Sequence, residues 1–299
     1  MLNFIFNTIF KALFNILGIL SLPSLHRLGA ALGWLIYYCS PKSAITIKNN
    51  IKTSGLAKNP QQFKQILNEN IAESGKAVLE TIGIWQKKEA DILPLVKQVH
   101  GWQIVKDALQ RGKGIIFLTP HLGCYEISPI YYGSKHPITV LYRLPKLQLL
   151  QQFILQGRTR TGVTLAQANT NGVRKLMQAL KRNEAIGILP DQIPAAGEGE
   201  WADFFGKPAY TMTLASKLAE KTGAAVLMAF AERLENGAGY NIHVTQVESI
   251  ATTSLLNAAI EQQIALKPAQ YLWRYDRHKQ RRHAMEKLES TNNQTNASE

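Results

Sequence analysis

The alternation of short apolar runs with helical segments between residues 101 and 266 constrains the fold of this chain more than any other feature. We expect strands at 115–118, 138–142, 163–165, 185–189, 225–230 and 240–247. Helices are expected at 60–85, at 102–110, shortly after 126, and at 146–156, 172–181, 211–221 and 255–266. Such alternation is typical of an α/β domain in which a largely parallel central sheet is flanked by helices.

The N-terminal segment differs from this domain in composition. Residues 4–20 and 28–38 are mostly apolar, and no acidic residue precedes Glu69, although several lysines and arginines do. An apolar segment with a basic flank indicates contact with a membrane. A polar residue recurs at every fourth position, at Asn3, Asn7, Lys11 and Asn15. A helix with such a polar stripe could span weakly, lie in the membrane interface or be a buried core helix, and the sequence leaves these three interpretations open.

We therefore divide the chain of 299 residues into three parts. Residues 1–40 are expected to form N-terminal apolar membrane-anchor helices, and residues 41–288 a single α/β domain. Residues 289–299 are rich in Ser, Thr and Asn, which is typical of a disordered tail. The net charge of +13 favours anionic partners. Basic and aromatic residues are not interleaved as they are in RNA-binding proteins, so we expect no nucleic acid.

Several kinds of site are excluded by what the sequence lacks. The two cysteines, Cys39 and Cys124, form no C-x-x-C pair, which excludes a disulfide scaffold and disfavours a zinc site. The chain also has no G-x-S-x-G, Walker A, H-E-x-x-H or strand-linked G-x-G-x-x-G motif. We expect no metal and no bound cofactor.

One H-x4-E motif, formed by His121 and Glu126, follows the expected strand at 115–118. Ligand sites of open α/β sheets lie at the carboxyl ends of strands, and a histidine can take a proton from a hydroxyl near neutral pH. We expect Glu126 to fold back on His121 and orient its ring, with Gly123 permitting the tight turn. The motif is weak alone, because an exposed histidine beside a surface glutamate gives the same pattern.

The wider context of this motif resembles a known family. Residues 114–126 resemble the first signature block of the lysophospholipid acyltransferase superfamily, and more particularly of the bacterial lipid A late acyltransferases. Further matching segments follow in the same order: Tyr142-Arg143, Gly157-Arg158, Leu189-Pro-Asp191-Gln192, Phe204-Phe-Gly206 and Pro268 to Arg274. The resemblance covers roughly residues 5–285.

The resemblance implies transfer of a fatty acyl chain from an acyl carrier protein thioester to a hydroxyl of an anionic, phosphorylated lipid A precursor. By the same resemblance, we expect the thioester to be a co-substrate and the site to lie at the cytoplasmic face of the bacterial inner membrane. The resemblance also implies that His121 is the general base and Glu126 its partner, that Arg158 and Asp191 belong to the active site, and that Arg143 is a candidate for phosphate binding. From the residues alone, either arginine could face solvent and Asp191 could cap a turn.

Several alternatives stay open. Cys124 lies inside the motif and could act as a thiol nucleophile, although the family's direct transfer needs none. The same chemistry could act on another membrane lipid, such as a phosphatidylinositol mannoside or a lysolipid, or the protein could be a catalytically silent lipid-binding protein. Trp273, Arg274 and the basic run 277–282 could contact substrate phosphate, the carrier protein or lipid headgroups, or could merely be solvated.

Overall fold

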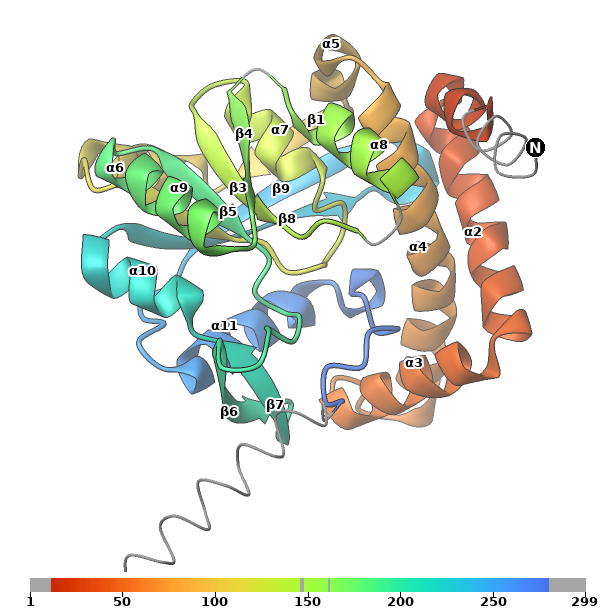
Figure 1. Ribbon diagram of the computed structural model, residues 1–299. Helices are drawn as coiled ribbons and strands as arrows, with labels where there is room; N and C mark the ends of the chain where they lie inside the picture. The colour runs from red at the N-terminus through yellow and green to blue at the C-terminus, as the bar shows by residue number, and fades with distance from the viewer. Residues whose placement is uncertain (1–11, 146–147, 161, 280–299) are drawn as a thin grey trace, which may run out of the picture.

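A central seven-stranded sheet forms the body of the protein (Figure 1), of which the computed structural model describes residues 12–145, 148–160 and 162–279. The strand order is β1-β9-β8-β2-β5-β3-β4, and only the β8–β9 pair is antiparallel. The strands are β1 (Val96–His100), β2 (Ile115–Leu118), β3 (Ile138–Tyr142), β4 (Val163–Gln167), β5 (Ala185–Ile188), β8 (Ala225–Arg233) and β9 (Tyr240–Gln246). The predicted α/β fold with a largely parallel central sheet is confirmed.

Helices cover both faces of the sheet. They are α2 (Leu22–Cys39), α3 (Pro41–Ser54), α4 (Pro60–Gln86), α5 (Glu89–Ile92), α6 (Trp102–Gln110), α7 (Ile127–Gly133), α8 (Gln148–Arg158), α9 (Thr170–Lys181), α10 (Leu214–Thr222) and α11 (Thr253–Leu266). Short 3-10 turns occur at Leu93–Leu95, Glu235–Gly237 and Pro268–Gln270. Helices α6 and α7 pack on one face, whereas α9 and α11 pack on the other.

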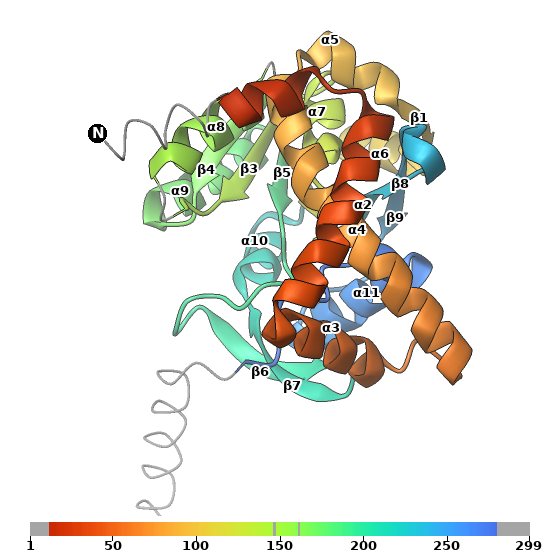
Figure 2. The ribbon, with the colours of Figure 1, turned by 90° about the vertical axis from the view of Figure 1, so that its right-hand side faces the viewer.

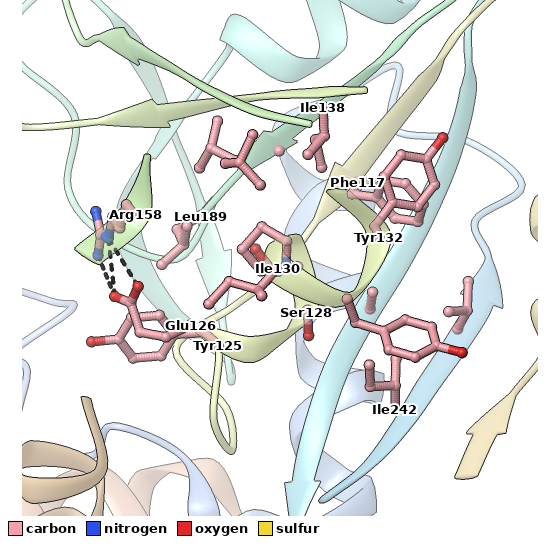
Figure 3. Close-up of a pocket in the computed structure, with 18 of the residues that line it drawn as sticks. Phe117, Tyr125, Glu126, Ser128, Ile130, Tyr132, Ile138, Arg158, Leu189 and Ile242 are labelled. Atoms are coloured by element: carbon pink, nitrogen blue, oxygen red, sulfur yellow. Dashed lines mark hydrogen bonds and ion pairs between the residues drawn. The ribbon is translucent and has the colours of Figure 1, made fainter. Parts of the chain in front are cut away.

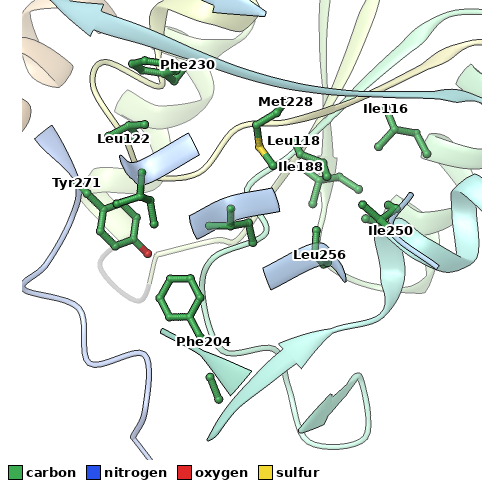
Figure 4. Close-up of a cluster of buried hydrophobic side chains, with 14 of the residues drawn as sticks. Ile116, Leu118, Leu122, Ile188, Phe204, Met228, Phe230, Ile250, Leu256 and Tyr271 are labelled. Carbon is green, nitrogen blue, oxygen red and sulfur yellow. The ribbon is translucent and has the colours of Figure 1, made fainter. Parts of the chain in front are cut away.

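Strand β2 shows why the central strands are continuously apolar. Its side chains alternate between two cores, because successive residues of a strand point to opposite faces. Ile115 and Phe117 join the core beneath α6 and α7, whereas Ile116 and Leu118 join the core on the other face (Figure 4). A strand that is buried on both faces has no polar side, as is usual in parallel sheets.

Several elements were not predicted from the sequence, among them helix α3 and the short helix α5. The edge strand β1 has a partly exposed, mixed pattern, and the hairpin of β6 (Gly199–Phe204) and β7 (Lys207–Met212) stands apart from the main sheet and packs on α11 (Figure 1). The predicted start of a helix at residue 211 is wrong, because β7 continues to Met212 and α10 begins at Leu214. The hairpin turn holds Phe205 and Gly206 at φ 50° and 69°. A phenylalanine in this conformation gives no recognisable turn signal.

Helix α2 packs closely along α4, as Figure 2 shows. The close approach depends on glycines: a Cβ on Gly33 would lie 2.0 Å from the Ile71 carbonyl oxygen, and one on Gly75 would lie 1.9 Å from that of Gly29. Helix α2 ends at Cys39 and α3 begins at Pro41, while the division of the chain into three parts stays a prediction. Because α2 packs along α4, residues 22–39 lie against the α/β domain.

Among the described residues, no helix combines the length and apolar character needed to cross a membrane. Residues 1–11 and the predicted tail at 289–299 lie outside the described part of the chain. A membrane-anchoring role for residues 1–40 stays a prediction.

Candidate active site

The centre of the site is a hydrogen-bonded pair of His121 and Asp191. His121 follows the end of β2 by three residues, and Asp191 follows the end of β5 by three, and these strands are parallel neighbours. Nδ1 of His121 lies 2.9 Å from Oδ1 of Asp191, and the backbone N–H of His121 donates to Oδ2 at 2.9 Å. Burial alone would raise the pKa of Asp191, but its contacts with His121 outweigh this and lower the pKa. The carboxylate is therefore ionised at neutral pH.

The hydrogen bonds of His121 determine its tautomer. An ionised Asp191 only accepts, so Nδ1 carries the proton. Nε2 of His121 lies 3.1 Å from the amide nitrogen of Gln192, which donates to it. Nε2 therefore holds a lone pair, as a general base requires.

Glu126 does not make its expected contact with His121, and the prediction that it orients the ring is wrong in this structure. Glu126 is buried, and its carboxylate accepts hydrogen bonds from Arg158 Nε at 2.9 Å, from Arg158 Nη2, and from Trp85 Nε1 at 3.1 Å. Glu126 directly precedes α7, so its side chain meets α8 and α4 instead. Asp191 takes the place that the sequence assigned to Glu126.

The loop that carries His121 is fixed by its backbone. Gly123 has φ +61°, and a Cβ there would lie 2.0 Å from the carbonyl oxygen of Ala231, so only glycine fits this tight turn. Its N–H donates to the Gln270 carbonyl at 3.1 Å. The His121 carbonyl accepts from the N–H of Leu272 at 3.1 Å. The prediction that Gly123 permits the turn is confirmed.

The predicted arginines lie at the same edge of the sheet. Arg143 directly follows β3 and is exposed, while Arg158 ends α8 and has a side chain that is 22% exposed. Both arginines line one cavity together with His121. Asp191 is buried behind His121 and does more than cap a turn. The structure thus brings His121, Asp191, Arg158 and Arg143 together. Glu126 is linked to this group through its hydrogen bonds with Arg158.

An apolar space, here called the inner cavity, lies between α7 and the sheet (Figure 3). It encloses about 770 Å³ including its open mouth. Its walls include Phe117, Ile130, Tyr132, Ile138, Val140 and Leu165. Glu126 and Arg158 lie at one end, away from Phe117 and Tyr132 (Figure 3). Gly187 of β5 also lines this cavity, and a Cβ there would lie 3.4 Å from Val140.

His121 lines two further cavities. The strand-end cavity, of about 1580 Å³, is bounded by the carboxyl ends of β3 and β4 and by the starts of α9 and α10, and Arg143, Asn169, Gln192 and Lys217 contribute to its lining. The helix-side cavity lies between α4 and residues 270–274, and its space of about 980 Å³ includes open solvent. The strand-end cavity shares Arg158 and Leu189 with the inner cavity.

A buried ionic network supports the His121 loop and was not predicted from the sequence. Arg233 donates through Nη2 to the Gly123 carbonyl at 2.7 Å and through Nε to Glu80 at 2.6 Å. Glu80 also bonds to His26 at 3.0 Å and accepts from the Tyr240 hydroxyl at 2.9 Å. These partners are far apart in the sequence, so no local motif signals them. Gln192 and Trp85 were likewise missed, although Gln192 directly follows the recognised Asp191.

Cys124 is buried, and its environment disfavours a thiolate. Burial and the negative charges of Glu80 and Glu126 raise the pKa of this thiol well above its usual value. A thiol that stays protonated is a poor nucleophile, which argues against the covalent alternative. Within the described ranges, no group of three or more acidic, histidine or cysteine side chains could hold a metal ion. A reaction without metal stays a prediction.

Fold and site together define an α/β protein that places a histidine with an unprotonated Nε2 in a site adjoining an apolar cavity. The chain belongs to the bacterial lipid A biosynthesis acyltransferase family, whose model matches residues 2–280. It is 25% identical over 266 residues to the lipid A biosynthesis palmitoleoyltransferase of Escherichia coli, covering 87% of this chain and 86% of the relative. The lauroyltransferase of the same species is 23% identical, with 87% and 86% covered. A phosphatidylinositol mannoside acyltransferase of Mycobacterium tuberculosis is 26% identical, with 59% and 58% covered.

Proposed function

We propose that this protein is an O-acyltransferase that moves a fatty acyl chain from an acyl carrier protein thioester to a hydroxyl of a lipid A precursor. The observation that carries this proposal is the position of His121. Its Nε2 holds a lone pair in a site that adjoins the apolar inner cavity through Arg158 and Leu189. The membership of the lipid A acyltransferase family supports the same reaction.

Direct transfer needs one base and no covalent enzyme intermediate. Nε2 of His121 removes the proton of the acceptor hydroxyl while the oxygen attacks the thioester carbonyl carbon. A carbon–oxygen bond forms, the tetrahedral intermediate collapses, and the carbon–sulfur bond breaks. The proton then passes from the imidazolium to the leaving thiolate, so the products are an ester and a free thiol. Asp191, bonded to Nδ1 at 2.9 Å, stabilises the imidazolium that forms in between.

Arg158 is the group that we assign to the thioester oxygen. Its Nε and Nη2 donate to Glu126, and its side chain lines both the inner and the strand-end cavities. The Glu126 pair holds the guanidinium in place, so the charge of Arg158 is oriented before the substrate arrives. Glu126 therefore acts in our proposal as a positioning residue for Arg158.

The inner cavity is suited to the acyl chain of the donor. Its lining is predominantly apolar, which suits a hydrocarbon chain. A chain in this cavity places its carbonyl near Arg158, because Arg158 and Glu126 lie at one end (Figure 3). The burial of each methylene contributes about 0.8 kcal/mol, which favours chains that fill the space.

We further propose that the protein works on the cytoplasmic face of the bacterial inner membrane. Large apolar side chains are exposed on the helical residues 12–19 and on α2: Leu13, Ile16, Ile19, Leu28 and Leu35. The absence of acidic residues before Glu69 adds attraction to anionic lipid. Together these features support membrane contact through the N-terminal helices.

A second acceptor class is favoured by one comparison. The phosphatidylinositol mannoside acyltransferase matches more than half of the chain at an identity similar to that of the lipid A enzymes. The catalytic step would be the same on either lipid, because the base and the donor sites are unchanged.

The test is an acyl-transfer assay with purified protein, acylated carrier protein and either a lipid A precursor or a phosphatidylinositol mannoside, read by mass spectrometry of the lipids. We expect a mass increase of one acyl chain on the lipid A precursor. If a product forms only with the mannoside, that lipid and not the lipid A precursor is the acceptor. If no product forms with any lipid acceptor, the result favours a silent lipid-binding protein.

A further inference from the structure

Among the residues that the structure describes, His121 is the only one that lines both the helix-side cavity and the strand-end cavity, so these cavities reach the catalytic ring from different sides. A transferase with two large substrates needs such separate routes, because both must be bound at once. We propose that the carrier thioester arm enters through the strand-end cavity, and that the phosphorylated lipid acceptor binds in the helix-side cavity with a phosphate at Arg274. This inference rests on the proposed acyl transfer.

The strand-end cavity suits the donor because it adjoins the inner cavity at Arg158 and Leu189. Arg158 and Leu189 line both spaces, so a thioester carbonyl at their boundary leaves its acyl chain inside and its carrier arm outside. The phosphopantetheine arm of a carrier protein carries amides and a phosphate. The strand-end cavity offers amide groups and the exposed cations Arg143 and Lys217, with Glu198 as a carboxylate on its wall. These cations also suit the acidic surface of the carrier.

The helix-side cavity has an apolar part and a polar part, and a phosphorylated lipid needs both. Apolar side chains form much of its wall, among them Phe14, Val78, Ile82 and Leu272. Phe14 belongs to the helical residues 12–19, in which Leu13 and Ile16 are exposed. An acyl chain that leaves a membrane at these residues can therefore reach His121 along α4.

The polar part of this cavity is centred on Arg274 and Ser74. Arg274 is exposed and makes no hydrogen bond or ion pair within the described residues, and the Ser74 hydroxyl is buried without a hydrogen-bond partner. Both also line a smaller adjoining cavity with Tyr37 and Ser43. A guanidinium and an unpaired hydroxyl in one place suit a phosphate monoester, because its oxygens accept hydrogen bonds from both groups.

One carboxylate also lies in this cavity, but its charge is compensated. Glu73 is bonded by Lys76 at 2.5 Å and by Arg233 at 3.2 Å. The charge of Arg274 is thus available to an anionic ligand.

The opposite assignment fits less well. The acceptor carries several acyl chains and stays with the membrane, whereas the carrier is a soluble acidic protein. The exposed apolar residues of 12–19 adjoin the helix-side cavity through Phe14, and the exposed Arg143 and Lys217 lie at the other one.

Steady-state kinetics with each substrate varied in turn test this assignment. Arg274→Ala is expected to raise the KM for the phosphorylated acceptor at least about fivefold, with the KM for the carrier thioester changed less than about twofold. The double variant Arg143→Ala/Lys217→Ala is expected to give the reverse pattern. Arg111→Ala is the matched control, because Arg111 is exposed and precedes β2 at the other end of the sheet.

A dephosphorylated acceptor identifies the contact. Wild type should show a raised KM for this lipid, and Arg274→Ala should raise it little further. The proposal is overturned if Arg274→Ala raises the KM for the carrier thioester and not that for the acceptor, or if it raises both equally. It is also overturned if Arg274→Ala raises the KM for the dephosphorylated lipid as much as that for the phosphorylated one. A fall in binding to phosphatidylglycerol vesicles without a change in acceptor KM also overturns it, since Arg274 would then contact bulk lipid.

A binding measurement separates this inference from the proposed function. His121→Ala protein is titrated with the acylated carrier and with the phosphorylated glycolipid in detergent micelles, with and without the Arg274→Ala and Arg143→Ala/Lys217→Ala changes. Selective loss of glycolipid binding in Arg274→Ala supports the acceptor site even when wild type shows no turnover, which would contradict only the acyl transfer. Unchanged binding of both ligands in all variants contradicts the two routes.

Discussion

Asp191 holds His121 at two points, with Oδ1 2.9 Å from the ring Nδ1 and Oδ2 2.9 Å from the backbone nitrogen. The two residues come from neighbouring parallel strands, so the sheet itself sets the position of the base. The same carboxylate determines the tautomer, so Nε2 keeps the lone pair that accepts a proton once the substrate hydroxyl replaces Gln192 as its partner. Asp191 therefore orients His121, whereas Glu126 bonds to Arg158 and holds that side chain in place.

Asp191→Asn should keep the shape of the pair and lose its charge. We expect kcat to fall about 1,000-fold or more, because an amide can favour the wrong tautomer and does not stabilise an imidazolium. The KM for both substrates should change little. Asp203→Asn, an exposed position, is the control. Near-normal kcat in a folded Asp191→Asn protein would remove Asp191 from the mechanism.

Glu126→Gln should lower both stability and activity, because the partly buried Arg158 side chain loses its counter-charge. Breaking a buried pair from one side costs about 3–5 kcal/mol. Urea unfolding should show a loss toward the lower end of this range, since Arg158 is partly exposed. Glu220→Gln on the surface of α10 should have no such effect. A wild-type unfolding free energy in Glu126→Gln would contradict a structural pair.

Cys124→Ala should retain activity within about twofold, since the buried thiol is held protonated and the transfer needs no covalent step. Mass spectrometry of wild type after brief exposure to the acyl thioester should show no acyl adduct. An adduct that maps to Cys124 and disappears in the variant would restore the thiol mechanism.

Glu80 gives the fold a defined pH dependence. Burial opposes its charge, yet Arg233 and His26 lower the pKa of Glu80 from 4.5 to about 2. A lowered pKa contributes stability that is present above the unfolded value and is lost as pH falls toward 2. Glu80→Gln should therefore lose about 3 kcal/mol at pH 7 and less at pH 3, as measured by urea unfolding. An equal loss at both pH values would show that charge is not the cause.

Gly187→Ala should shift the preferred donor toward shorter acyl chains. The added methyl group enters the wall of the inner cavity at 3.4 Å from Val140, without a clash with the backbone. Competition between acyl carrier thioesters of different chain length, read from the lipid products, measures the shift. An unchanged product distribution would indicate that the chain does not bind in this cavity.

The sequence allowed the sheet and the neighbourhood of His121 to be predicted for a physical reason. Strands such as β2 and β5 are apolar on both faces, and the carboxyl ends of parallel strands share one edge. His121, Arg143 and Asp191 each follow such a strand, so their convergence followed from topology.

The partner of His121 could not be predicted in this way. Glu126 is near in sequence, but after the turn at Gly123 its side chain points to α8, whereas Asp191 lies 70 positions away. The hairpin β6–β7 was missed because Phe205 occupies a turn position that usually takes asparagine or glycine. The Glu80–Arg233 network joins residues from α4 and β8, and only tertiary packing brings them together.

The most direct measurement is single-turnover acyl transfer by wild type and His121→Ala, with both proteins shown to bind the carrier thioester and the lipid acceptor. Wild type should form the acylated glycolipid, and His121→Ala should form it at least about 100-fold more slowly, because the hydroxyl keeps its proton. Turnover by His121→Ala at a rate near that of wild type would contradict the assignment of His121 as the base.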